Sequence, residues 1–194
     1  MTFRKLLLGG AAITGLTAAA FAHSGATGVV KQRMEAMKSM GEAVKRIRPM
    51  MAGEAAPDAA AIRRAARTIA AESGNAMLEK FPQGSMDDPT EALPRIWEEW
   101  GRFVAIADQL ELAAKGLERA AGNGLTVDGH MMDSQSGMMG GQSGMMGGGM
   151  IMGGDGFPDG MTPERMGRMP VDRAFMMVTQ TCSACHDRYR QEDD

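Results

Sequence analysis

The chain of 194 residues is nearly balanced in charge, with 21 lysines and arginines against 24 aspartates and glutamates. This balance excludes a protein that binds nucleic acid by electrostatic attraction, because such a protein needs a basic excess. The two cysteines are too few for a disulfide-rich scaffold or a four-cysteine zinc site. Methionine is unusually frequent, with 21 residues, and the length suggests one domain with an insertion.

The first 22 residues have the form of a secretion signal. Arg4 and Lys5 form a basic start, an apolar stretch covers residues 6–21, and Ala-Phe-Ala at residues 20–22 matches a small-x-small cleavage pattern. A retained membrane anchor is the alternative, but glycines and threonines interrupt the apolar stretch, which is short for a membrane span. We expect cleavage after Ala22 and a mature protein that is periplasmic, with no membrane attachment.

Apolar residues recur with helical spacing in four segments. The clearest covers residues 28–51, where apolar side chains form one stripe at intervals of three and four. The second segment begins at Asp58, a residue type that caps helices. The other three helices are predicted over residues 57–82, 94–122 and 170–190. No segment alternates with period two for long enough to predict a strand. The pattern therefore predicts an all-α fold, with residues 23–194 forming an antiparallel four-helix bundle.

A glycine- and methionine-rich insertion separates the third and fourth helices, at about residues 125–169. The heptapeptide QSGMMGG occurs there twice in tandem. We expect a flexible loop, because ordering so much glycine costs too much backbone entropy. The paired methionines, with His130 near the start, are soft ligands that could hold a copper ion, Cu(I). The alternative is a low-complexity expansion, which the tandem repeat favours.

Cys182, Cys185 and His186 form a C-x-x-C-H motif. At this spacing two thiols can add to the vinyl groups of a haem while the adjacent imidazole ligates the iron. Positions i, i+3 and i+4 share one face of a helix, so the three groups converge. A thioredoxin-like pair would follow a strand, and a zinc site would need further ligands, for which only His23 and His130 remain among the histidines. The motif predicts one covalently attached haem c with His186 as an iron ligand.

At this point the sequence resembles the class II c-type cytochromes, meaning cytochrome c′ and the low-spin cytochrome c-556 type. Residues 30–33 (Val-Lys-Gln-Arg) followed by Met37 look like the first-helix pattern of that family. Pro94-x-Ile96-Trp97 looks like its third-helix motif, and residues 182–190 look like its C-terminal signature. The resemblance covers roughly residues 29–122 and 170–191.

The resemblance implies that Met37, four residues after Arg33, decides the function. In cytochrome c′ an apolar side chain at this position leaves the iron five-coordinate, whereas in the c-556 type a methionine ligates it. We expect His186 and Met37 to ligate the iron of a one-electron carrier that turns over no substrate. The alternatives are a five-coordinate protein that binds NO or CO and a copper-binding protein that uses the insertion. Met37 could also be core filler, and Met34 or Met40 could replace it as the ligand.

Two arginines and two tryptophans complete the candidate residues. The resemblance implies that Arg33 lies near a haem propionate and that Arg190 lies close to the proximal side of the haem. The alternative for each arginine is a solvated surface position. We expect Trp97 and Trp100 to belong to the core rather than to an electron relay. We expect redox partner proteins with basic docking patches. A homodimer through the first two helices is possible, and the sequence leaves the oligomeric state open.

Overall fold

A computed structural model describes residues 26–87, 89–126, 157–158 and 160–191. The predictions for residues 1–22, for His130 and for the repeats of the insertion lie outside the described residues. Seven helices are described: α1 (Gly28–Met51), α2 (Ala59–Ala71), α3 (Asn75–Leu78), α4 (Arg95–Glu98), α5 (Trp100–Ala120), α6 (Pro163–Met166) and α7 (Val171–Tyr189). None of them is long and apolar enough to cross a membrane.

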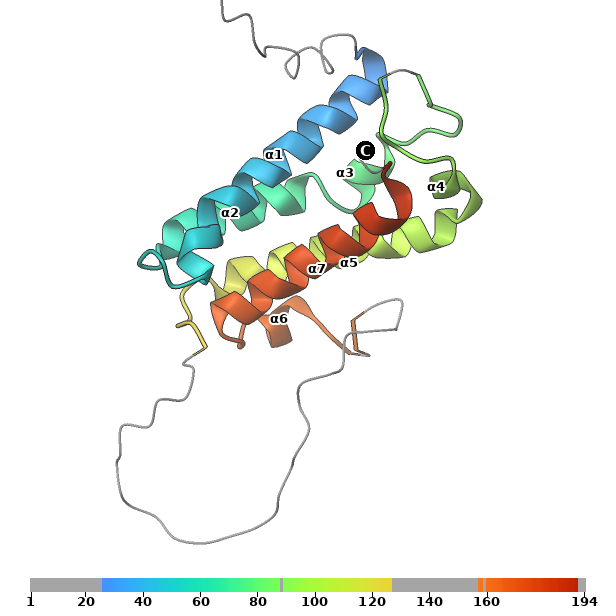
Figure 1. The fold of residues 1–194 in the computed structure, drawn as a ribbon. Coiled ribbons are helices and arrows are strands. Elements are labelled where there is room, and N and C mark those ends of the chain that lie inside the picture. Colours follow the sequence, from blue (N-terminus) through green and yellow to red (C-terminus); the bar gives the residue numbers. More distant parts are fainter. Residues whose placement is uncertain (1–25, 88, 127–156, 159, 192–194) are drawn as a thin grey trace, which may run out of the picture.

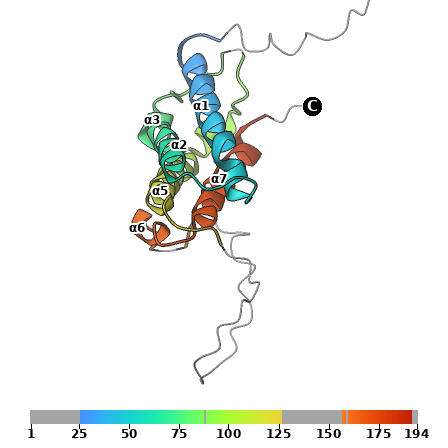
Figure 2. The same ribbon diagram turned by 90° about the vertical axis from the view of Figure 1, so that its left-hand side faces the viewer.

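The four long helices α1, α2, α5 and α7 form a bundle (Figure 1), so the predicted all-α four-helix bundle is confirmed. Helix α5 packs against α2 and α7, and α1 packs against α2. The contact between α1 and α7 is much thinner. Turned by 90°, the bundle shows α1 and α7 on one side and α2 and α5 on the other (Figure 2). Because α1 and α7 touch so little, room remains between them for a site.

The apolar stripe of residues 28–51 faces the core as predicted, with Val30, Met40 and Ile47 buried. Helix α2 begins at the predicted cap, where Asp58 Oδ1 accepts hydrogen bonds from the backbone N–H groups of Ala60 at 2.8 Å and Ala61 at 3.0 Å. Local signals therefore set the start and the orientation of these helices.

The predicted helix over residues 57–82 is in fact two helices, α2 and α3. Gly74 separates them with a φ of +56°, a left-handed conformation that glycine adopts without strain. Its N–H donates to the carbonyl of Ala107 in α5 at 3.1 Å. A Cβ at this position would lie 2.5 Å from Glu111 Oε2. The break therefore lets the backbone approach α5 closely before α3 begins.

The predicted flexible insertion is too long at its C-terminal side, because residues 160–169 are folded onto the bundle. Helix α6 starts at the cap Thr162, whose hydroxyl accepts from the N–H of Arg165 at 3.3 Å. Met166 is buried against Gly116 of α5. The Asn123 side chain donates to the carbonyls of Gly167 at 2.9 Å and Met169 at 2.5 Å. A Thr-Pro pair is typical of a helix start, but the glycine-rich sequence around it favoured the prediction of a loop.

Candidate functional site

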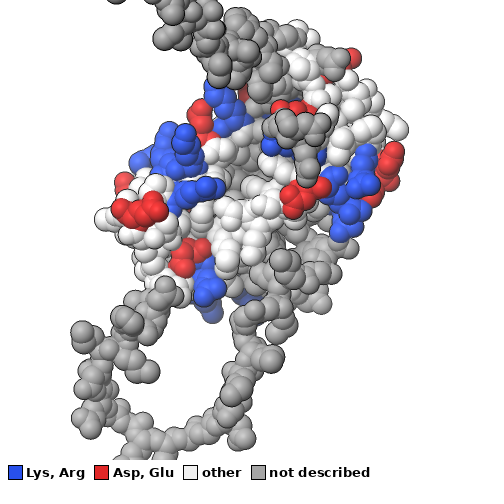
Figure 3. All heavy atoms as spheres, viewed as in Figure 1, with Lys and Arg blue, Asp and Glu red and all other residues white. Residues whose placement is uncertain are grey.

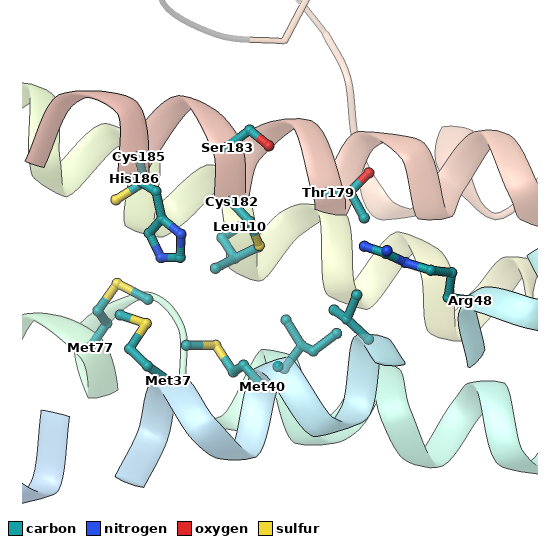
Figure 4. Close-up of a pocket in the computed structure, with 13 residues that line it drawn as sticks. Met37, Met40, Arg48, Met77, Leu110, Thr179, Cys182, Ser183, Cys185 and His186 are labelled. Atoms are coloured by element: carbon teal, nitrogen blue, oxygen red, sulfur yellow. The ribbon is translucent and has the colours of Figure 1, made fainter. Parts of the chain in front are cut away.

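A cavity of about 220 Å³ lies between α1 and α7. One wall comes from α7 and contains Thr179, Ser183 and the two cysteines and the histidine of the C-x-x-C-H motif. The opposite wall contains Met37, Met40 and Val44 of α1 and Met77 of α3. Figure 4 shows the His186 imidazole pointing from α7 towards Met37 and Met77. The structure therefore brings the motif and Met37, which are far apart in the sequence, to one site.

Both cysteines are free thiols and partly buried. Burial raises the pKa of the Cys182 thiol, and burial together with the neighbouring Cys182 raises the pKa of Cys185 to about 12. Both groups are therefore neutral in the apolar cavity. They lie three residues apart on one helical face, as the motif predicts.

The imidazole of His186 is also uncharged at neutral pH. Burial lowers the pKa of His186, and the positive charge of Arg190 lowers it further, although Asp187 and Glu91 oppose the shift. A neutral imidazole has a nitrogen lone pair free to ligate a metal. The motif thus presents two neutral thiols and one neutral nitrogen donor to the same space.

Three methionines make up much of the wall opposite His186. Met37 lies there as predicted, and Met40, which was considered as a replacement, lines the cavity as well. Met34, the other replacement, is not among the lining residues. Met77 is a functional candidate that sequence reasoning missed, since a methionine within a helix is ordinarily core filling. Only the break at Gly74 and the packing of α3 bring it to this cavity.

Arg33 is buried, so the solvated surface alternative for it is wrong. Its guanidinium donates to Lys80 O at 2.9 Å, to Ser85 O at 3.1 Å and Oγ at 2.7 Å, and to Thr90 Oγ1 at 3.3 Å. It also lies over the Phe81 ring, 4.4 Å from the centroid. Arg33 does not line the cavity, and it ties α1 to the segment before α4.

Arg190 lies outside the lining residues too, in a half-exposed ion pair with Glu91 at 2.5 Å. Trp97 is partly buried, and its Nε1–H donates to Phe81 O at 3.1 Å. The Trp100 ring lies 5.6 Å from the Phe103 ring in a tilted arrangement, but Trp100 remains 37% exposed, so the expectation that it belongs to the core is wrong. The structure therefore gathers four of the six predicted cofactor residues and leaves the two arginines outside.

The donor set fits a haem. Two thiols and an imidazole on one wall match the attachment points of a covalently bound macrocycle and its iron. Val44, Ile69 and Leu110 with the methionines supply apolar surface for its flat faces. Arg48, at the rim, is the one permanently charged side chain among the described lining residues.

The family model described as Cytochrome C′ matches residues 28–142. The chain belongs to the cytochrome c′ family. The family binds one covalently attached c-type haem, as the motif predicts. The match ends within the insertion and does not include the C-x-x-C-H motif. The fold of the chain, rather than the family model, places this motif at the site. The curated cytochrome c′ of Rhodopseudomonas palustris (strain ATCC BAA-98 / CGA009) is 38% identical over 89 residues, which are 45% of this chain. The matched part spans about 60% of that relative's length.

Solved cytochrome c′ structures share the fold. A mutant of the Rhodopseudomonas palustris protein has a TM-score of 0.57 and 24% identity, covering 86% of this chain and 100% of its own. Cytochrome c′ of Shewanella frigidimarina has a TM-score of 0.55 and 20% identity, covering 84% and 94%. A ferrous variant of the Alcaligenes xylosoxidans protein with bound NO has a TM-score of 0.54 and 21% identity, covering 85% and 94%. These similarities support the bundle and the place of the C-terminal helix in it.

Proposed function

We propose that this chain is a haem protein that binds a small diatomic gas, NO or CO, on the methionine side of the cavity. Cys182 and Cys185 attach the haem through thioether bonds, and His186 is the proximal ligand. The observation that carries the proposal is the placement of His186 opposite an apolar, thioether-rich wall (Figure 4). His186 would hold the iron of a bound haem, which would supply the metal centre that a further ligand on the methionine side could bind.

The wall opposite His186 suits an uncharged gas. Met37, Met40, Val44 and Ile69 bring no charge and no strong hydrogen-bond donor to the cavity. NO and CO are uncharged and lose little hydration on entering such an apolar space. Alcaligenes xylosoxidans cytochrome c′ variants have been solved with bound NO and with bound carbon monoxide, which supports this ligand class. The function is binding rather than substrate turnover.

A second candidate function is one-electron transfer with Met37 as the sixth ligand. It is supported by the position of Met37 on the wall that the His186 imidazole points to. A thioether ligand would close the site and favour the reduced state. The relatives solved with gases favour the first function over this one.

Optical spectroscopy of the haem-loaded protein separates the two functions. Gas binding predicts a high-spin ferric spectrum and a ferrous protein that takes up CO, with both properties kept in Met37→Leu. Electron transfer predicts a low-spin ferric spectrum that becomes high-spin in Met37→Leu but not in Met34→Leu, a matched methionine of α1 outside the cavity. A wild-type low-spin spectrum together with no CO uptake would overturn the proposed function.

We further propose a homodimer through the exposed faces of α1 and α2. One solved cytochrome c′ is described by its ligand-controlled dimer dissociation, which supports such an assembly. Sedimentation of the haem-loaded protein with and without CO tests it.

On the face in Figure 3, basic and acidic side chains alternate without a patch of one sign. This face therefore offers a redox partner no patch of a single sign, and recognition at this face depends on more than net charge.

The family is periplasmic. Export of this chain by residues 1–22 is our proposal, supported by the basic start and the Ala-Phe-Ala pattern. The N-terminal residue of protein purified from periplasm tests it, since cleavage after Ala22 predicts His23.

A further inference from the structure

Met77 reaches the cavity from a different direction than Met37 and Met40. It belongs to α3, is 4% exposed and lines the same wall. Figure 4 shows its side chain beside that of Met37, with both facing the His186 imidazole. Two thioethers from two helices therefore share the space opposite the proximal ligand.

The backbone fixes Met77 independently of α1. The Met77 N–H donates to Gly74 O at 3.0 Å, and the Gly74 N–H donates to Ala107 O of α5 at 3.1 Å. The left-handed turn at Gly74 lets this segment lie close to Glu111. These backbone bonds involve α3 and α5 and not α1, so the side chain is the part of Met77 that can move.

We propose that Met77 controls access of a gas to the face opposite His186, together with Met37. The inference rests on the proposed function, in which that face receives the ligand. Protein interiors are close-packed, so a ligand entering here must displace a side chain. Methionine is flexible enough to move aside, but it has to move before the ligand can bind. A required rearrangement lowers the association rate, so the size of residue 77 should set that rate.

The test measures the CO association rate of ferrous haem-loaded protein by stopped flow or flash photolysis. Met77→Ala should bind CO about tenfold faster, because no side chain has to move, whereas Met77→Leu should stay within about twofold of wild type. Met177→Ala is the matched control, since Met177 is 5% exposed in the core but is not among the lining residues. It should also stay within about twofold. Met77→Val replaces Met77→Ala if the alanine variant does not fold.

The same variants are made in a Met37→Ala background, so that the result does not depend on whether Met37 ligates iron. Faster CO binding on truncation of Met77 in either background supports the inference. Unchanged rates in both backgrounds, or equal acceleration in Met177→Ala, overturn it. A wild type that takes up no CO, with a Met77 effect in the Met37→Ala background, overturns the proposed function but supports the role of Met77. Ferric optical spectra show independently whether Met77→Leu leaves the coordination unchanged, as a steric role requires.

Discussion

Arg188 and Glu99 join the C-terminal end of α7 to the junction between α4 and α5. The Arg188 guanidinium donates from Nη2 to Glu99 Oε1 at 2.7 Å and from Nε to Oε2. The buried Tyr189 donates its hydroxyl to Glu99 Oε2 at 3.1 Å. Since His186 lies one half-turn before Arg188, this network holds the helix end that carries His186. A backbone bond from Leu93 N–H to Tyr189 O at 2.9 Å reinforces it.

Replacing Glu99 by Gln should destabilise the folded protein at neutral pH, and this difference from wild type should disappear in acid. The hydrogen bond from Arg188 lowers the pKa of Glu99 below its ordinary value of 4.5; partial burial opposes the shift, and the Tyr189 hydroxyl adds to it. A carboxylate with a lowered folded-state pKa stabilises the fold above its unfolded pKa and loses that contribution as the pH falls through the folded value. Thermal unfolding of wild type and Glu99→Gln should therefore differ by a constant amount at neutral pH and converge in acid. A difference that does not shrink at low pH would contradict this role.

Arg33→Leu should destabilise the protein because the oxygen atoms of Lys80, Ser85 and Thr90 lose the hydrogen bonds from the guanidinium. We expect a loss of about 2–4 kcal/mol in the free energy of unfolding, since several hydrogen bonds to one charged group are lost. Arg33→Lys, which keeps the charge but cannot reach all three partners, should lose about half as much. Urea unfolding measures both, with Arg67→Leu as control. Arg67 forms an exposed pair with Glu118, so its loss should cost less than about 1 kcal/mol. Equal losses for Arg33→Leu and Arg67→Leu would show that the buried hydrogen bonds of Arg33 add nothing to the free energy of unfolding.

Gly116→Ala should loosen α6 from the bundle. A Cβ at Gly116 would lie 2.4 Å from Met166 Sδ and 2.5 Å from its Cβ, so the helix must shift. Overpacking of this kind costs about 1–3 kcal/mol. Gly101→Ala, in the same helix with open space around it, should instead be neutral or stabilise by up to about 1 kcal/mol. Urea unfolding compares the two, and limited proteolysis of residues 160–169 reports the loosening directly. Unchanged proteolysis of Gly116→Ala would be inconsistent with this packing.

Cys182→Ala combined with Cys185→Ala should abolish covalent attachment of haem, because no thiol remains on the α7 wall. Haem staining after denaturing electrophoresis measures attachment, and the double variant should show no stained band. Ser183→Ala changes the same wall between the two thiols and should keep the band. A stained band in the double variant would place the attachment elsewhere.

The local signals in the sequence predicted the long helices well. The stripe over residues 28–51 and the cap at Asp58 match the observed helices because each depends on residues within a few turns. The pairing of Cys182, Cys185 and His186 on one face was equally local, since helix periodicity alone brings i, i+3 and i+4 together. The family resemblance then aligned Met37 with the opposite side of the cofactor.

The residues around that site depend on tertiary packing. Met77 faces His186 because Gly74 turns the chain against α5, and Arg33 is buried because a segment about fifty residues away supplies its acceptors. The Glu99–Arg188 pair spans 89 residues in the same way. The type of a residue indicates whether it is buried or forms an ion pair. Its partner, however, depends on which helices pack together. Local sequence patterns therefore predicted the long helices and the attachment of haem, whereas the packing of α1, α3 and α7 determines the walls of the cavity.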